Sequence, residues 1–191
     1  DEGSAGLRFM PDTAFYGGGN FAIQASIISD SSGLGGDMVT AIITVNPIAD
    51  TPSITNAVTD EDSISTSGLA ISRNTADGDE VTHFKITGIT NGSLFKNDGT
   101  TTISNNEFIN FDEGSAGLRF MPDTAFYGEG FFAIQASLNS DNSGLGGSQV
   151  TAIITVNPSG CTDTLACNYN ESVTINDGSC EYAEENYDCD G

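Results

Sequence analysis

Cysteine is the residue type with the most evident chemistry in this chain of 191 residues, and all four cysteines lie after residue 160. They are separated by 6, 13 and 9 positions, so none forms the C-x₂₋₄-C pair typical of structural zinc sites, although four thiols could ligate zinc. Because so short and polar a segment cannot build a hydrophobic core, a disulfide-stapled module is the better interpretation. Spacing alone leaves three pairings open for Cys161, Cys167, Cys180 and Cys189.

Acidic side chains are the second feature of the sequence with chemical potential, because they are abundant. The sequence has 27 acidic and 5 basic residues, for a net charge of −22. This balance excludes nucleic acid as a partner, because phosphate binding needs clustered cations, and it disfavours an anionic membrane surface. An acidic surface either keeps a secreted chain soluble or collects divalent cations, and both interpretations stay open. No apolar run of 18 residues exists, so we expect no membrane span.

Catalytic chemistry is not expected. The single histidine, His83, lies on a predicted strand in the opposite phase to Phe84 and Ile86, which places it on the outer face. With one histidine and oxidised thiols, no nucleophile and base can be paired. We therefore predict no catalytic residue and no enzyme activity.

An internal repeat organises the chain. Residues 1–47 align without a gap with residues 112–158, at an offset of 111 positions, and 40 of the 47 pairs are identical. A period of 111 is too long for a solenoid unit and is typical of an independent domain. We therefore expect the back half of one repeat at 1–47, a complete repeat at 48–158 and a different tail at 159–191. A chain that starts inside a repeat is expected to be an excerpt of a longer array.

The repeat has the pattern of an all-β sandwich. Short apolar runs are separated by Gly, Ser, Thr and Asn every 8–12 residues, and helical periodicity is absent. The pattern predicts strands near 53–57, 68–73, 81–89, 93–97, 101–110, 116–122, 130–139 and 149–157.

Differences between the two copies indicate which faces are buried. Alternation places on one face Phe21, Ile23, Ala25 and Ile27, matched in the second copy by Phe132, Ile134, Ala136 and Leu138. The single change on this face replaces Ile by Leu, whereas the other face exchanges Asn for Phe and Ile for Asn. Cores tolerate volume-conserving changes and solvated faces tolerate changes of polarity. By the same alternation the last strand points inward with Val150, Ala152, Ile154 and Val156.

Residues 1–158 resemble the cadherin-like repeats of very large bacterial surface adhesins. The resemblance lies in "GLRFMPDTAFYGEGFFAIQAS", with its apolar-P-x-x-x-F-x-G segment before a Phe-rich strand, and in the linker and acidic segment of "VTAIITVNPIADTPSITNAVTDEDS". It implies an immunoglobulin-like sandwich, an extracellular location and a stalk role.

The same resemblance implies calcium at the domain junctions. Hard oxygen ligands of this kind suit Ca²⁺, and we expect the linker Asp50 to converge with Asp60, Glu61 and Asp62. The D-x-D of the family is not intact, because Asn74 and Ala76 occupy its positions in "SRNTADGDEV". Substitute ligands there are Asp77, Asp79 and Glu80. The alternative is that all of these are solvated loop carboxylates.

The tail resembles a short Cys-rich repeat of marine bacterial, Bacteroidota-like, surface proteins, of the form G-C-T-D-x-x-A-x-N-Y-N-x-x-A-x-x-D-D-G-S-C. The match spans residues 160–180, with Val173 and Asn176 as departures. Many such repeats carry only the first and last cysteine of the pattern, which implies the pairs Cys161–Cys180 and Cys167–Cys189. The final "DCDG" resembles the start of a thrombospondin type 3 calcium loop, which implies Asp188 and Asp190 as further calcium ligands.

A third resemblance concerns modification. Asp followed by Ser or Thr and an apolar residue is similar to the general O-glycosylation sequon of Bacteroidota. It would modify Thr13, Ser63, Thr124 and Thr164. Three-residue patterns are weakly specific in a Thr-rich acidic chain, so chance matches are the alternative.

These observations lead us to expect a structural stalk segment of a secreted, cell-surface adhesin or filament, stiffened by calcium and disulfides. The alternatives are a module that binds a glycan or receptor, and a segment of a phage fibre. Sandwich edges offer unpaired backbone groups, so self-association into fibres is a further expectation, and an orphan half-domain could accept or donate strands.

Overall fold

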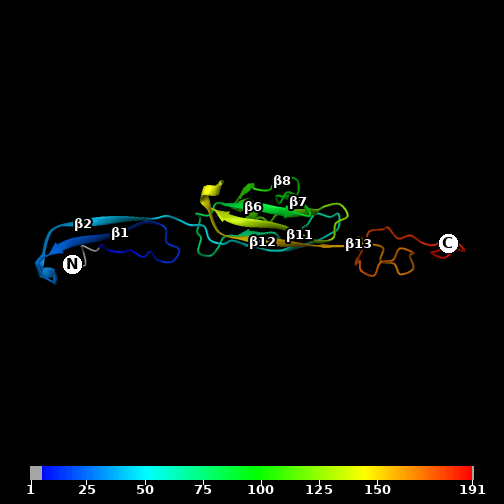
Figure 1. The fold of residues 1–191 in the computed structure, drawn as a ribbon, viewed down its shortest axis with the longest axis horizontal. Helices are drawn as coiled ribbons and strands as arrows, with labels where there is room; N and C mark the ends of the chain where they lie inside the picture. Colours follow the sequence, from blue (N-terminus) through cyan, green and yellow to red (C-terminus); the bar gives the residue numbers. More distant parts are fainter. Residues whose placement is uncertain (1–5, 191) are drawn as a thin grey trace. The chain divides into compact units, whose positions relative to one another are not determined.

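The computed structural model describes residues 6–190, and its regular secondary structure is almost entirely β (Figure 1). The chain divides into two compact units, with the boundary between Ile48 and Ala49. The first unit is a strand hairpin, and the second contains a β-sandwich followed by the cysteine-rich tail. Within the described residues, no helix is long and apolar enough to cross a membrane.

The larger sheet of the sandwich has five strands in the order β4-β12-β11-β6-β9. Its centre is the hairpin of β11 (Gly128–Ser137) and β12 (Leu145–Asn157), joined by the short 3₁₀ helix η3 (Asn142–Gly144). Strand β6 (His83–Thr90) continues the sheet beside β11, and β9 (Phe108–Asn110) follows it, both antiparallel. On the other side, β4 (Ala57–Asp60) pairs in parallel with the end of β12.

The opposing layer is formed by smaller sheets. β10 (Arg119–Pro122), β7 (Gly92–Phe95) and β8 (Thr102–Ile103) make a three-stranded sheet. β3 (Ser53–Ile54) and β5 (Ile71–Ser72) form a two-stranded sheet. Buried side chains from both layers form one core, which includes Phe84, Phe120 and Phe132.

The predicted inner face of the central hairpin is confirmed. Phe132, Ile134 and Ala136 are fully buried, and Leu138 packs against the core at its margin. On β12 the buried residues are Ala152, Ile154 and Val156, with Val150 partly buried. The all-β sandwich predicted from alternation is therefore the observed fold of the complete repeat.

The structure departs from the predicted strands in two places. The strand expected at 101–110 is divided into β8 and β9 by a turn in which Asn106 has a φ of 71°, a left-handed conformation that Asn tolerates better than most residues. A short helix, α1 (Phe111–Ser115), precedes β10, where no helix was expected. Its capping box joins Asn110 and Glu113, a local signal that outweighs the absence of helical periodicity.

The first unit repeats only the central hairpin of the sandwich. β1 (Gly17–Ser26) and β2 (Leu34–Val45), linked by the 3₁₀ helix η2 (Ser31–Gly33), pair in the same register as β11 and β12. The face predicted to be inward is not buried in this unit, because residues 6–48 as described form no second layer over it. Ile23 is 52% exposed and Ile27 is 92% exposed, whereas their equivalents Ile134 and Leu138 are buried or partly buried.

The tail has little regular structure and is held together by covalent bonds. β13 (Ser159–Gly160) and β14 (Ile175–Asn176) form a short parallel ladder. Disulfides join Cys161 to Cys180 and Cys167 to Cys189, the pairs named in the sequence analysis. Only three of its hydrophobic positions are buried, namely Cys161, Ala166 and Val173, so the tail is the disulfide-stapled module expected.

Candidate functional site

An acidic group lies at the end of the sandwich where the chain enters it. The backbone N–H of Asp50 donates to both carboxylate oxygens of Asp77, at 3.0 and 3.3 Å. Asn74 donates from its side chain to the Thr51 carbonyl at 3.0 Å, and Ser148 donates its N–H to the Thr51 hydroxyl at 2.8 Å. The linker is thus bound to the loop between β5 and β6 and to the start of β12.

Two glycines of the segment "SGLGG" at residues 143–147, where β12 begins, make this arrangement possible. A Cβ atom on Gly146 would collide with the Ala49 carbonyl oxygen, and one on Gly147 would collide with the backbone of Asp50 and Thr51. Gly147 also has a φ of 62°, a conformation that side chains disfavour. The turn therefore leaves the space in which the linker packs against the start of β12.

The Asp77 carboxyl is partly buried and lies near other negative charges. Burial raises the pKa of Asp77 above its ordinary value, and the nearby charges of Asp50 and Glu80 raise it further, although the N–H donated by Asp50 acts in the opposite direction. Glu80 buries one carboxylate oxygen, Oε2, for which the described residues provide no hydrogen-bond partner. A cation here would relieve both costs. Even so, no three acidic, His or Cys side chains within residues 6–190 are arranged to hold a metal ion.

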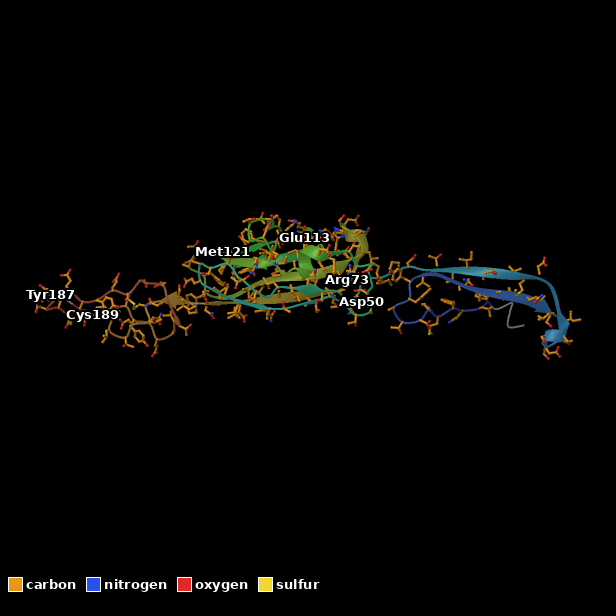
Figure 2. The ribbon with its side chains drawn as sticks, turned by 180° about the vertical axis from the view of Figure 1, so that it is seen from behind. Asp50, Arg73, Glu113, Met121, Tyr187 and Cys189 are labelled. Atoms are coloured by element: carbon orange, nitrogen blue, oxygen red, sulfur yellow. A yellow bond between two sulfur atoms is a disulfide. The ribbon has the colours of Figure 1, made fainter. Side chains whose placement is uncertain are left out.

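Asp79 has a different partner. It forms an ion pair with Arg73 at 2.8 Å, although its own side chain is 99% exposed. Arg73 is the better-anchored member of the pair: its Nε donates to the Val81 carbonyl at 2.7 Å, and its guanidinium lies 3.7 Å from the centre of the Phe111 ring. Figure 2 shows Arg73 and Asp50 at the same end of the sandwich. The sequence analysis did not predict these contacts of Arg73, because Arg73 and Phe111 are far apart in the sequence and no spacing pattern connects them.

The acidic triplet lies at the opposite end of the sandwich from Asp50. Strand β4 runs parallel to β12 and places Asp60 beside Asn157, whereas Asp50 lies beside Gly147. Asp60 accepts from the Asn157 side chain at 3.1 Å. The structure therefore does not bring Asp50 and the triplet together.

The other two members of the triplet also bind the chain itself. Glu61 accepts from the Ser159 N–H at 3.0 Å and from its hydroxyl at 3.2 Å. Asp62, at a φ of 55°, accepts from the Ala125 N–H at 3.1 Å. These bonds connect the end of β4 to the start of the tail and to the turn before β11, so each carboxylate has a structural role.

The tail presents aromatic side chains around a hollow of about 350 Å³. Its lining includes Tyr182, Tyr187 and Asp188, next to the Cys167–Cys189 disulfide. Figure 2 labels Tyr187 and Cys189 in this part of the tail. The Asp188 carboxylate accepts the Asp190 N–H at 3.1 Å, and both residues are exposed. The predicted calcium pair thus lies at one edge of a loop whose further ligands are not assembled within the described residues.

A tyrosine–aspartate contact connects this hollow to the start of the tail. Tyr182 donates its hydroxyl to Asp163 at 2.8 Å. The Leu165 N–H and this hydroxyl together lower the pKa of Asp163, and the same hydrogen bond raises the pKa of Tyr182. Asp163 therefore orients one of the two aromatic rings while it remains ionised.

The remaining predicted positions are dispersed over the surface. The hydroxyl-bearing residues Thr13, Ser63, Thr124 and Thr164 are all exposed. The Asp-Thr-Ala turns of the two copies share a left-handed alanine, Ala14 in one and Ala125 in the other. His83 is partly exposed, and its Nδ1 lies 2.8 Å from the Thr82 hydroxyl, within a strand rather than in a cleft.

Comparison with known proteins gives little further information. No protein family matches the chain, and no curated protein matches it. Among solved structures, the chain is similar to a conjugate transposon protein (residues 27–141) from Bacteroides vulgatus, determined in solution by NMR. The similarity has 17% identity and a TM-score of 0.37, and it covers 58% of this chain and 86% of that one.

Proposed function

We propose that this chain is a stalk segment of an extracellular, cell-surface adhesin or filament built from cadherin-like repeats. The observation that carries the proposal is the near-identical tandem repeat, 40 of 47 aligned residues, whose complete copy forms a sandwich around one hydrophobic core. Repetition of one domain along a chain extends it, and therefore suits a role in length and spacing.

The arrangement of the module supports this role. Ala49 lies against the start of β12, and the chain leaves the sandwich after the end of the same strand. The module therefore receives the chain at one end and releases it at the other, as a linear array requires. Two disulfides in a short polar tail are typical of proteins that work outside the cytoplasm.

Calcium is part of the proposal at the linker end of the sandwich. Asp77 and Glu80, beside Asp50, are the side chains that would hold it, because one is crowded by like charge and the other buries an unpartnered oxygen. The cation would supply charge neutralisation there and would fix the linker against the turn at Gly146 and Gly147. Completion of its coordination requires water or further oxygen ligands.

Electron microscopy of a chain with several repeats, in calcium and in chelator, tests the stalk. We expect extended particles with a narrow distribution of end-to-end distances in calcium and a broad one in chelator. The variant Asp77→Ala should resemble the chelated sample, and Asp112→Ala, which changes an exposed acid on α1, should not. Compact particles in both conditions would contradict the stalk role. Extended particles whose end-to-end distances are the same in calcium and in chelator would contradict only the proposed calcium site.

A second candidate function, glycan or receptor binding, is favoured by the hollow in the tail. Tyr182 and Tyr187 are 58% and 62% exposed, and aromatic faces next to carboxylates suit a sugar ring. Glycan-array binding that is lost in Tyr187→Ala would support it. Tyr127→Ala is the matched control, because Tyr127 is equally exposed, at 63%, but lies on the sandwich. Equal loss in both variants, or no binding at all, would contradict a binding role for the tail.

Glycosylation at the four Asp-Ser/Thr-apolar positions completes the proposal. Their exposure gives a modifying enzyme access to each hydroxyl. Intact-mass measurement of the native protein should show additions in sugar-sized steps, which Thr13→Val and Thr124→Val would reduce. A mass equal to that of the bare sequence would contradict it.

A further inference from the structure

The hollow in the tail is bordered by segments that covalent and hydrogen bonds hold in place. The Cys167–Cys189 disulfide forms part of its lining. The Cys167 N–H donates to the Glu181 carbonyl at 2.7 Å, and the Glu181 N–H donates to the Asn168 side chain at 2.8 Å. These bonds connect the segment that carries Tyr182 to the segment around Cys167. The hollow is therefore a feature of the folded, disulfide-linked tail.

Two tyrosine rings give the hollow an aromatic surface. Tyr182 and Tyr187 both line it and are both exposed, so a ligand can reach the ring faces. The Tyr182 hydroxyl donates to Asp163 at 2.8 Å, which limits the rotation of that ring. Tyr187 lies in a turn closed by its own N–H, which donates to the Glu184 carbonyl at 3.0 Å. Because the rings are positioned before a ligand binds, less conformational entropy is lost on binding.

The charge around the hollow has one sign. Three of its lining residues are acidic, namely Glu181, Glu184 and Asp188. The tail from residue 159 onward contains eight acidic residues and no Lys or Arg. Both ion pairs found among residues 6–190 lie in the sandwich, so neither neutralises the tail. A concave surface with charge of one sign attracts ligands of the opposite sign, here cations.

The aromatic surface and the negative charge together select a class of ligand. An anion would meet like charge and would find no Lys or Arg to bind it. A neutral sugar can stack on the rings, but it leaves the charge of the carboxylates uncompensated. An ammonium group satisfies both features, because cations bind over aromatic faces and are attracted by carboxylates. The volume of about 350 Å³ is within the range of small-molecule sites.

We propose that the hollow binds an organic ammonium cation, carried by a quaternary amine or by an amino sugar. The cation lies against the faces of Tyr182 and Tyr187, and Glu181, Glu184 and Asp188 supply the compensating charge. This inference rests on the second candidate function, binding by the tail, and it specifies the chemical class of the ligand. The stalk role does not depend on it.

Titration of small amines into the whole chain tests the class of ligand, with binding followed by NMR of the tyrosine rings. Choline is compared with its neutral carbon analogue, in which a tert-butyl group replaces the trimethylammonium group. We expect saturable shifts of Tyr182 and Tyr187, with choline bound roughly fivefold more tightly than the analogue. Tyr127, on the sandwich, should not shift. A chelator in the buffer prevents metal ions from competing for the carboxylates.

Glucosamine and N-acetylglucosamine distinguish the two sources of the cation. They share a sugar ring, but only glucosamine carries a charged nitrogen. Tighter binding of glucosamine than of choline would identify an amino sugar as the ligand, and the reverse order would identify a quaternary amine.

Three outcomes of these titrations would overturn the proposal. Equal affinity within both pairs of compounds would show that the hollow does not distinguish a charged ligand from a neutral one. Binding of the neutral sugar alone would reject the cation and leave glycan binding by the tail in place. No binding of any compound would reject both the cation and the glycan at this hollow, while the stalk role would stand.

Variants of Tyr187 test the aromatic contact. Tyr187→Leu should weaken choline binding roughly two- to fivefold, whereas Tyr187→Phe keeps the ring face and should retain it. The amide signals of Cys161 and Val173, which are buried in the tail, should be unchanged in both variants if the tail remains folded. Full choline affinity in Tyr187→Leu with a folded tail would overturn the contact.

Two adjacent acidic residues test the contribution of charge. Glu184 lines the hollow and Glu185 does not, although both are exposed. Glu184→Gln should therefore weaken choline binding more than Glu185→Gln, which removes the same charge from the tail. Equal weakening in the two variants would show that only the net charge of the tail attracts the amine, and it would overturn the hollow as the site.

Discussion

Arg73 shows how one side chain joins three parts of the sandwich. Its guanidinium lies over Phe111, its Nε binds the Val81 carbonyl, and its ion pair with Asp79 extends into solvent. The first two contacts are partly shielded from water and depend on a planar, forked cation. The third is exposed, and such pairs contribute little. The stabilising effect of Arg73 therefore lies in the ring contact and the carbonyl.

This difference gives a testable prediction. Arg73→Lys should lower the free energy of unfolding by about 1–2 kcal/mol, because a lysine cannot stack on the ring and reach the carbonyl together. Asp79→Asn should lower it by less than about 0.5 kcal/mol. Urea denaturation of both variants measures the two effects. A larger loss in Asp79→Asn than in Arg73→Lys would contradict the assignment.

Asp77 gives a prediction of pH dependence. Its pKa is raised in the folded protein, so the folded state binds this proton more tightly than the unfolded chain, whose carboxyl has the ordinary value of 3.8. Stability therefore falls as the pH rises from 3.8 through the raised pKa. In chelator, Asp77→Asn should be more stable than the natural protein at pH 7, and the gain should disappear below pH 3.8. Denaturation at several pH values checks this, and a destabilised variant at pH 7 would contradict it.

At the scale of elements, the alternation of apolar residues and the internal repeat predicted where the main strands lie. They did not predict where strands are interrupted or where the short helix forms. The strands β6, β7, β10, β11 and β12 lie where alternation predicts them, because their inward residues enter one core. The division between β8 and β9 depends on the left-handed Asn106, and α1 depends on a cap between Asn110 and Glu113. Such breaks depend on single residues, whereas a periodic pattern is read over a whole segment and does not reveal them.

The tail gives a prediction at the same scale. Its disulfides close loops with sequence separations of 19 and 22, each of which stabilises the folded state by about 3 kcal/mol in the chain-entropy model. Reduction should therefore unfold residues 159–190 and leave the sandwich folded, since the core cluster contains no tail residue. Hydrogen exchange with and without reductant measures this. Loss of protection in β11 and β12 on reduction would contradict it.

At the scale of the whole molecule, the two copies form an internal comparison. Ile134 and Ile23 have the same neighbours in sequence, yet only Ile134 is buried. Ile134→Ala should destabilise the sandwich by about 2–5 kcal/mol, because it removes buried apolar volume. Ile23→Ala should leave the unfolding of the sandwich almost unchanged, because Ile23 is half exposed and lies outside it. Thermal unfolding of the two variants compares them directly. Similar losses would mean that the face around Ile23 is already covered in solution.

The candidate site was less predictable than the fold, for a reason visible at this scale. Asp50 and the triplet at residues 60–62 are close in sequence, but the parallel pairing of β4 with β12 carries the chain from one end of the sandwich to the other between them. The junction site that the resemblance implies, with Asp50 and the triplet together, is therefore not the arrangement in this sandwich. The position of Asp77 beside Asp50 depends on contacts between distant segments, which spacing does not reveal.

The pairing of β4 with β12 also has a mechanical consequence. The first of these strands follows the linker, the second precedes the tail, and they run in the same direction with Ala57 opposite Ile154 and Asp60 opposite Asn157. A pull applied at the two ends of the module drags the strands past each other, so their hydrogen bonds bear the load together in shear. An antiparallel terminal pair would instead open like a zipper, one bond at a time. The module is thus built to resist extension along its own axis.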